Sequence, residues 1–278
     1  MLLELFHKAL FAFISGFSEL IFTSASAHQL LYRTVTGYDL DDHFLSFGIH
    51  LGCLIALLIH CQKRIKHLRN EKRLENLSGR RRGRKADVAA LMDVRILNTA
   101  VIPVLIGFCF YRKTATWGSS PFWLALLLIG NGVVLFLPRL LRSGNKNGRS
   151  FTQMDGLLVG LSGMLGMLPG FSRTGCMFSA CLARGGGKNY ALDLSLLLSI
   201  PAVAAMLGFD LYGCFVTAGG AAGLQLLGCV VAGLAAYAGT HFSIILIRSI
   251  CSRSTTEGFA YYSWGLAMFL LLIYLFVS

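Results

Sequence analysis

Three ionisable side chains, Glu19, His28 and Arg173, lie in otherwise apolar or small-residue stretches of the sequence. Ionisable groups are costly at membrane depth, so these three are the first candidates for a functional site. A guanidinium can bind phosphate oxygens bidentately and offset charge in phosphoryl transfer. A carboxylate can hold a divalent cation or act as a base, and an imidazole can transfer a proton. The set predicts chemistry on a phosphate ester or anhydride.

Small and hydroxyl residues accompany the three groups. Gly170 and Gly175 let the backbone approach an anion closely, and a half-helix beginning near Thr174 would point amide N–H groups at it. We therefore expect substrate binding by Ser24, Gly170, Thr174 and Gly175. Ser26 and Ser172 lie in the same loops, and we expect them to orient the phosphate or to supply a nucleophile.

Each of these residues also has a purely structural interpretation. Arg173 could cap carbonyl groups or pair with Glu19, a buried histidine often only satisfies a hydrogen bond, and hydroxyls help helices to pack. His43, His50 and His60 share one apolar stretch, and we favour packing or interfacial roles for them over metal binding. Asp193 is typical of an N-terminal helix charge.

The elements that position these residues are predicted to be membrane helices. The chain is 55% hydrophobic and only 14% charged, well below the charge of an ordinary soluble domain. The fold class predicted is an all-α polytopic membrane protein, in which about 20 apolar residues span the bilayer. Six spans are expected, at 43–61, 96–111, 121–138, 191–209, 222–246 and 258–277. Eight cysteines without paired spacing indicate small buried side chains, not disulfides or a zinc site.

Two further apolar segments, 5–30 and 153–184, are interrupted by polar, small or helix-breaking residues. The interruptions read TSASAH and PGFSRTG. Irregular backbone is tolerated at membrane depth only where it is buried in protein or lines a cavity. We therefore predict two re-entrant helix hairpins.

The hairpins predict an inverted repeat. The segment 14–28 aligns with 161–175 without a gap, and each hairpin is followed by three spans. An odd number of crossings inverts the second copy, as in many transporters, and places the site between the copies. The first repeat is expected at 1–138 and the second at 139–278. Chance alignment of two Gly- and Ser-rich segments is the alternative.

The basic residues predict the orientation. Of 25 Lys and Arg, 12 lie in the segment 62–95, which we predict to be a cytoplasmic loop. With that loop inside, the inside segments hold 20 basic residues and the outside segments four, which are Lys8, Arg33, Arg112 and Lys113. The net charge of +12 could also suggest nucleic acid, but no groove-reading motif accompanies it, so we expect no nucleic-acid partner. Binding of anionic membrane lipids is the simpler expectation.

At PGFSRTG the chain resembles the bacterial undecaprenyl-diphosphate phosphatase family. That family's second signature is Pro-Gly-x-Ser-Arg-Ser-Gly; Pro169, Gly170, Ser172, Arg173 and Gly175 match it, with Thr174 replacing Ser. The later segment SLLLSIPA (195–202) is also similar to a family segment. The resemblance covers most of the chain in span order.

The first hairpin matches the family pattern in part. That pattern reads Glu-Gly-x-Thr-Glu-Phe-Leu-Pro-x-Ser-Ser-x-Gly-His, and Glu19, Ser24 and His28 match it in register. Four positions differ: Ser15 replaces the first glutamate, Phe22 the proline, Ala25 the second serine and Ala27 the glycine. The family's paired glutamates are implicated with a divalent cation, so the resemblance implies Mg²⁺ or Ca²⁺ with Glu19 as the retained ligand.

The resemblance implies a membrane phosphatase that converts undecaprenyl diphosphate to undecaprenyl phosphate and recycles the cell-wall lipid carrier. It also implies a bacterial plasma-membrane location and a site open to the outer face. Arg173 would hold the diphosphate, Glu19 would position a metal or activate water, and His28 would assist proton transfer.

Two alternative functions and the oligomeric state remain open at this point. The Ser15 and Ala25 departures favour a relative that binds or translocates polyprenyl phosphates without hydrolysis. An ion-coupled solute transporter would require an acid in a second span, for which Asp193 is the candidate. A homodimer stays open.

Overall fold

The computed structural model describes residues 2–277 apart from residues 39, 41, 79–85, 142–143, 218–222 and 254–256. The described residues form ten α-helices and one short 3-10 helix, and they contain no β-strand. The predicted all-α class is confirmed. The helices are α1 (Leu2–Leu20), α2 (Ala25–Thr36), α3 (His43–Ser78), α4 (Val88–Thr114), η1 (Ala115–Ser119), α5 (Pro121–Leu140), α6 (Gln153–Leu165), α7 (Arg173–Ala183), α8 (Lys188–Thr217), α9 (Gly223–Arg253) and α10 (Glu257–Val277).

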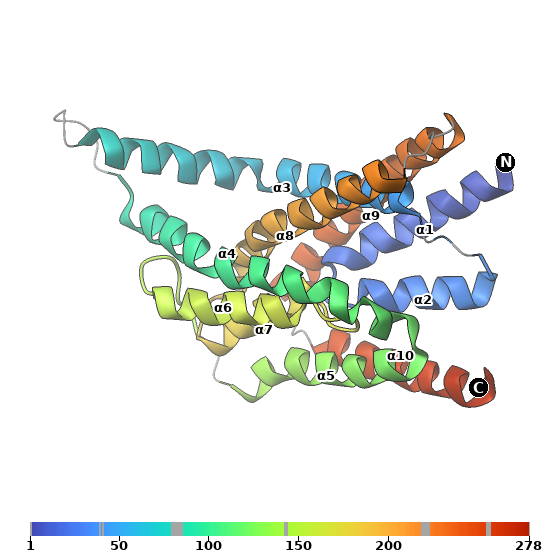
Figure 1. Ribbon diagram of the computed structural model, residues 1–278. Coiled ribbons are helices and arrows are strands. Elements are labelled where there is room, and N and C mark those ends of the chain that lie inside the picture. Colours follow the sequence, from blue (N-terminus) through green and yellow to red (C-terminus); the bar gives the residue numbers. More distant parts are fainter. Residues whose placement is uncertain are drawn as a thin grey trace.

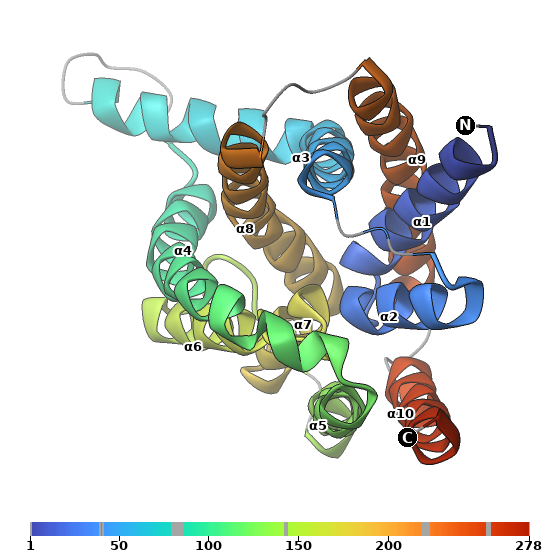
Figure 2. The same ribbon diagram turned by 45° about the vertical axis from the view of Figure 1, so that its right-hand side comes forward.

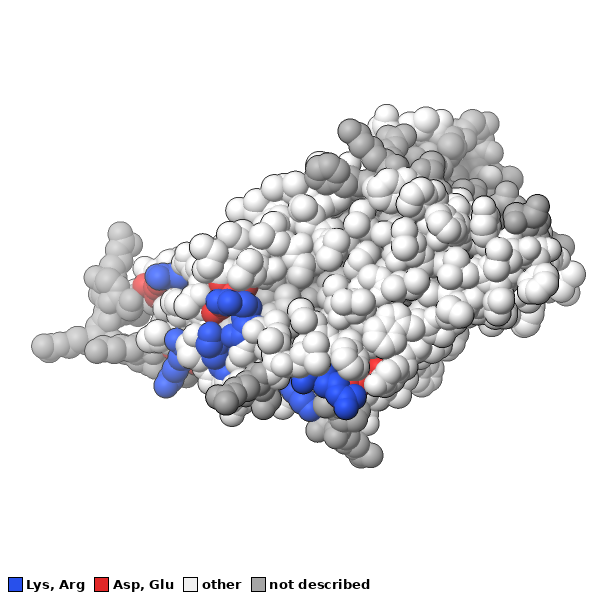
Figure 3. Space-filling view, turned by 90° about the horizontal axis from the view of Figure 1, so that it is seen from below, with Lys and Arg blue, Asp and Glu red and all other residues white. Residues whose placement is uncertain are grey.

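Six of the described helices, α3, α4, α5, α8, α9 and α10, are long and apolar enough to cross a membrane. Large apolar side chains such as Phe215, Leu234 and Phe276 stand exposed on them. Such a surface suits lipid, in which exposed apolar groups carry no penalty. Figure 3 shows one face of the molecule, where the charged residues gather toward one end and a broad uncharged surface fills the rest.

Two breaks between consecutive helices lie at the polar interruptions of the sequence. Residues 21–24 separate α1 from α2, and residues 166–172 separate α6 from α7. Helices α2, α6 and α7 have 12, 13 and 11 residues, too few to cross a bilayer core of about 20 residues. These breaks lie within the predicted hairpin segments 5–30 and 153–184.

The prediction that residues 62–95 form a loop is wrong for most of that segment. Helix α3 continues to Ser78, and α4 begins at Val88 (Figure 1). Residues 63–78 are rich in Lys, Arg, Glu and Leu, which are good helix formers, and ion pairs such as Lys72–Glu75 at 3.6 Å support the extension. Hydropathy marks the apolar part of a helix, whereas its backbone continues beyond. Helices α4 and α9 exceed their predicted spans for the same reason, while α8 continues past Asp210 through the apolar residues 211–216. The remaining residues, 79–85, lie outside the described part of the chain.

The four helix pairs described next recur when the two predicted repeats are exchanged. Helix α1 packs on α9, and its counterpart α6 packs on α4. Helix α3 packs on its counterpart α8, and α5 on its counterpart α10, as Figures 1 and 2 show for α5 and α10. This pattern supports the predicted inverted repeat, because a two-fold relation between halves requires it.

Close glycine contacts hold the two equivalent crossings together. A Cβ atom at Gly16 of α1 would lie 2.4 Å from the carbonyl oxygen of Ala236 in α9. A Cβ atom at Gly160 of α6 would lie 2.4 Å from the carbonyl oxygen of Ala100 in α4. Only glycine permits such backbone approach, which is how membrane helices gain packing energy.

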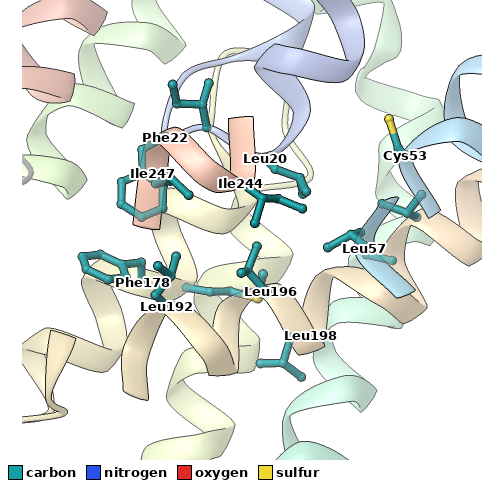
Figure 4. Close-up of a cluster of buried hydrophobic side chains, with 14 of the residues drawn as sticks. Leu20, Phe22, Cys53, Leu57, Phe178, Leu192, Leu196, Leu198, Ile244 and Ile247 are labelled. Atoms are coloured by element: carbon teal, nitrogen blue, oxygen red, sulfur yellow. The ribbon is translucent and has the colours of Figure 1, made fainter. Parts of the chain in front are cut away.

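A buried apolar cluster fixes the first break. Phe22, within the break, packs against Phe178 of α7 with ring centroids 4.7 Å apart. Leu20, Leu196 of α8 and Ile244 of α9 belong to the same cluster, which Figure 4 shows gathered between the helices. The break is therefore anchored from several helices, and the polar residues beside it are held in defined positions.

Candidate active site

The two breaks are joined by hydrogen bonds from hydroxyl groups to carbonyl oxygens. The Thr174 hydroxyl donates to the carbonyl oxygen of Leu20 at 3.0 Å, and the Ser172 hydroxyl donates to that of Ile21 at 3.2 Å. Helix α1 ends at Leu20, where the last carbonyl groups have no helical partner. The start of α7 therefore satisfies the end of α1 and fixes one hairpin against the other.

Serine side chains cap the two helices that begin at the breaks. Ser24 caps α2, since its hydroxyl oxygen accepts from the Ala27 amide at 3.3 Å, and Ser172 caps α7 by accepting from the Gly175 amide at 3.2 Å. A third hydroxyl crosses between the hairpins: Ser26 accepts from the Gly170 amide at 3.0 Å. Gly170 has a φ of 88°, a conformation that favours glycine.

An ion pair joins the hairpins beside these hydrogen bonds. Arg173 Nη2 donates to Glu19 Oε1 at 2.6 Å, and the two side chains are 5% and 13% exposed. Among the described residues, the Arg173 Nη1 group contacts only sulfur atoms, Met206 Sδ at 3.3 Å and Met167 Sδ at 3.7 Å, and Nε has no hydrogen-bond partner. Thioether sulfur is a weak acceptor. The buried guanidinium therefore keeps donor capacity for an oxygen ligand.

A cavity of about 480 Å³ opens beside this ion pair. That volume lies in the range of small-molecule sites, about 300 to 1,000 Å³. Of the residues predicted from sequence, Glu19, Ser26, Ser172 and Arg173 line it. The other lining residues are Thr23, Ala25, Gln29, Leu30, Arg33, Ser46, His50, Gly118, Ser119, Gly166, Met167, Leu168, Pro169, Phe171, Met206 and Asp210.

The remaining predicted residues do not line this cavity. His28 contacts the Ser24 carbonyl oxygen through Nδ1 and the Tyr262 hydroxyl through Nε2, both at 2.7 Å. It is not brought together with Glu19 and Arg173 at the cavity. Ser24, Gly170, Thr174 and Gly175 act through the backbone contacts described above and are not part of the lining. For these four residues the observed contacts are structural.

Two family positions that differ in this chain have clear surroundings. Ser15 is 1% exposed, and its hydroxyl oxygen accepts from Gln29 Nε2 at 3.2 Å. Ala25 lies in the cavity wall. A serine hydroxyl and a glutamine amide thus occupy the region where the family pattern would add a carboxylate, and a methyl group occurs where it would add a hydroxyl.

Sequence reasoning missed a second ionisable pair in the cavity wall. His50 Nδ1 of α3 and Asp210 Oδ2 of α8 lie 2.5 Å apart, and both residues line the cavity. The predicted span 191–209 stops one residue before Asp210, whereas α8 continues to Thr217. The signal was an acid between apolar segments, MLGF before it and LYG after it. Asp193 instead pairs with Arg248 at 3.0 Å, away from the cavity.

The arrangement suits an anion that carries several oxygens. Helices α2 and α7 both begin at the cavity wall, and helix N-termini favour negative charge. Arg33 and Arg173 add positive charge, while Glu19 and Asp210 offer carboxylates. The site thus combines a phosphate-binding guanidinium with groups that can hold a cation or accept a proton.

The carboxylates alone provide few metal ligands. No cluster of three or more His, Cys, Asp or Glu residues suited to a metal ion occurs in the described part of the chain. Mg²⁺ often binds through one or two carboxylates together with substrate phosphate oxygens. Glu19 fits that mode, and the buried Thr23 hydroxyl, which lines the cavity and has no hydrogen-bond partner among the described residues, adds an oxygen donor.

Comparison with known proteins shows the family. The model of the family described as bacitracin resistance protein BacA matches residues 8–269. The chain belongs to the BacA family. An undecaprenyl-diphosphatase of Thioalkalivibrio sulfidiphilus is 30% identical over 277 residues, covering 98% of this chain and all of the relative.

Other BacA-family relatives agree over nearly the whole chain. An undecaprenyl-diphosphatase of Carboxydothermus hydrogenoformans is 28% identical, covering 96% of this chain and 97% of the relative. One from Halothermothrix orenii is 25% identical, with 98% of each chain covered. The resemblance inferred from PGFSRTG is confirmed, and it includes both hairpins.

Proposed function

We propose that this protein hydrolyses undecaprenyl diphosphate to undecaprenyl phosphate and inorganic phosphate. Membership of the BacA family and full-length similarity to undecaprenyl-diphosphatases support the reaction. The six apolar helices are consistent with a lipid substrate presented within a membrane. The product would return the lipid carrier to cell-wall synthesis.

The proposal rests on the burial of the Arg173 guanidinium and on its contacts. Its guanidinium is buried at the cavity wall, yet within the described part of the chain one amino group contacts only thioether sulfur and Nε has no hydrogen-bond partner. A buried donor left unsatisfied costs about 1–3 kcal/mol, or more for a charged group. Phosphate oxygens would relieve that cost, so Arg173 is the group we assign to binding the diphosphate.

The other residues prepare the site. Glu19 orients the Arg173 guanidinium and carries the charge that would help to hold a cation. Ser26 and Ser172, for which a catalytic role was expected, already bond to backbone groups of the opposite hairpin. We assign them to holding the breaks in place and assign water as the nucleophile.

A divalent cation, Mg²⁺ or Ca²⁺, is the proposed cofactor. Glu19 and the Thr23 hydroxyl would hold it together with phosphate oxygens. When bound, the cation would offset the negative charge of the phosphate oxygens.

We further propose a bacterial plasma-membrane location with the cavity open to the outside. The 20 to four distribution of basic residues predicts that the α3–α4 connection is inside. Ser46 and His50 come from the opposite end of α3, and Met206 and Asp210 come from the later half of α8. These ends lie on the side predicted to be outside.

The test is phosphate release from undecaprenyl diphosphate by the detergent-purified protein, with Mg²⁺, with Ca²⁺ and with chelator. We expect turnover that needs a cation and disappears in Arg173→Ala. Full activity in that variant would contradict the phosphate-binding role, and full activity in chelator would contradict the cation.

Binding or translocation of a polyprenyl phosphate is the second candidate function. The observation in its favour is the cavity wall at Ala25 and Ser26, where one family serine is a methyl group and the neighbouring hydroxyl is bonded to Gly170. A folded protein that binds the lipid diphosphate and releases no phosphate would decide for this candidate.

A further inference from the structure

The cavity holds an acid–histidine pair to which the proposed roles assign no function. His50 Nδ1 contacts Asp210 Oδ2 at 2.5 Å, and their side chains are 13% and 9% exposed. They line the same cavity as Arg173 and Glu19 but come from two spanning helices, α3 and α8, not from the hairpins. Ionisable groups at such depth are costly and indicate function.

The geometry leaves one ring nitrogen available for chemistry. A carboxylate at Nδ1 fixes the orientation of an imidazole and stabilises its protonated form. Within the described part of the chain, Nε2 of His50 makes no hydrogen bond, while the residue itself lines the cavity. His28 differs, because Ser24 and Tyr262 contact both of its ring nitrogens.

Resting on the proposed phosphatase function, we infer that His50 is the general base of the reaction and that Asp210 is its positioning residue. Nε2 of neutral His50 accepts a proton from water while the water oxygen forms a bond to the terminal phosphorus. The bond from that phosphorus to the bridging oxygen breaks. Its electron pair stays on the bridging oxygen, which leaves as part of undecaprenyl phosphate. His50 then releases the proton to the water outside.

The charges around His50 suit this role. Asp210 faces it from α8, and the cavity wall adds Glu19 from α1, Arg33 from α2 and Arg173 from α7. The other helices packed on α3 contribute no charged residue at this depth, since 96–110 of α4 and 224–240 of α9 contain none. Asp210 is therefore the close counter-charge of His50, and the arginines line the same cavity.

The test compares variants of the two residues with matched controls on the same helices. His50→Gln is compared with His60→Gln, because His60 also lies on α3 but contacts His241 outside the cavity. Asp210→Asn is compared with Asp193→Asn, since Asp193 lies on α8 and pairs with Arg248. The readouts are kcat, KM and the pH dependence of phosphate release from undecaprenyl diphosphate.

We expect His50→Gln to lower kcat by about 100-fold or more with little change in KM, and to remove the acidic limb of the pH profile. Asp210→Asn should lower kcat with little change in KM, because the carboxylate no longer orients the His50 ring. Asp210→Glu should restore part of the rate. The controls should keep the wild-type profile.

Each of the following three outcomes would overturn the inference. An active wild type with an equally active His50→Gln overturns the inference and leaves the proposed function standing. Loss of rate in Asp210→Asn that Asp210→Glu does not restore in part assigns the pair to helix packing and also overturns it. A folded wild type without phosphate release overturns the proposed function, and this inference with it.

Discussion

Arg173 and Glu19 form an ion pair of 2.6 Å between residues 154 positions apart in the sequence, one near the end of α1 and the other at the start of α7. The pair does more than join the hairpins, because it orients a guanidinium whose Nη1 and Nε groups have no oxygen partner among the residues that the structure describes. The ion pair and the first residues of α2 and α7 thus line the same cavity.

Removing the carboxylate of the pair should destabilise the protein and impair the reaction. Glu19→Gln leaves a buried guanidinium without its counter-charge, which costs about 3–5 kcal/mol when a buried pair is broken. Since Glu19 is 13% exposed, we expect the lower end of that range. Thermal unfolding in detergent measures the loss. A Tm within a degree of wild type would argue against the pair as a tie between hairpins.

Glu19→Gln should also change the dependence of phosphate release on cation concentration. If Glu19 holds Mg²⁺ or Ca²⁺ together with the substrate, Glu19→Gln should need a much higher cation concentration for half-maximal phosphate release. Asp193→Asn, which changes a carboxylate outside the cavity, should titrate like wild type. Equal cation requirements in Glu19→Gln and wild type would remove Glu19 from the metal site.

The hydroxyl of Thr174 should contribute measurably to stability. Thr174→Val keeps the shape but leaves the buried Leu20 carbonyl oxygen without its donor, at a cost of about 1–3 kcal/mol. Ser179→Ala on the same helix is the matched control, because the Ser179 hydroxyl is buried and has no hydrogen-bond partner in the part of the chain that the structure describes. Comparison of their denaturation midpoints checks the prediction; similar midpoints would show that the contact between the breaks contributes little.

The glycine crossing of α6 and α4 should be intolerant of a side chain. Gly160→Ala would place its Cβ 2.4 Å from the Ala100 carbonyl oxygen, so the helices must separate at a cost of about 1–3 kcal/mol or more. Gly208→Ala meets open space and should have little effect. Purified yield and Tm of both variants test this, and a Gly160→Ala protein as stable as Gly208→Ala would contradict the crossing.

Hydropathy and composition predicted much of the fold. The six spans and the two broken segments could be placed because apolar length and polar interruptions are local signals. Helix ends could not: the basic continuation of α3 to Ser78 has no apolar signal, and only its helix propensity marks it.

The site was predicted where residue type and loop position agreed, as for Glu19 and Arg173. It was missed where a residue lies in a regular helix and only a distant partner reveals its role. His50 resembles an interfacial histidine until Asp210, 160 residues away, is placed beside it. The serines and Thr174 show the converse, because hydroxyl chemistry in the sequence does not reveal that backbone carbonyls and amides occupy those groups.

The most direct measurement is the rate of phosphate release from undecaprenyl diphosphate by wild type, Arg173→Lys and Arg248→Lys. Lysine keeps the charge but cannot form a planar bidentate contact, and Arg248 lies outside the cavity. We predict turnover by wild type and Arg248→Lys and a loss of about 100-fold or more in Arg173→Lys, corresponding to about 2.7 kcal/mol or more. Equal rates in all three would contradict the assignment of Arg173 as the phosphate-binding group.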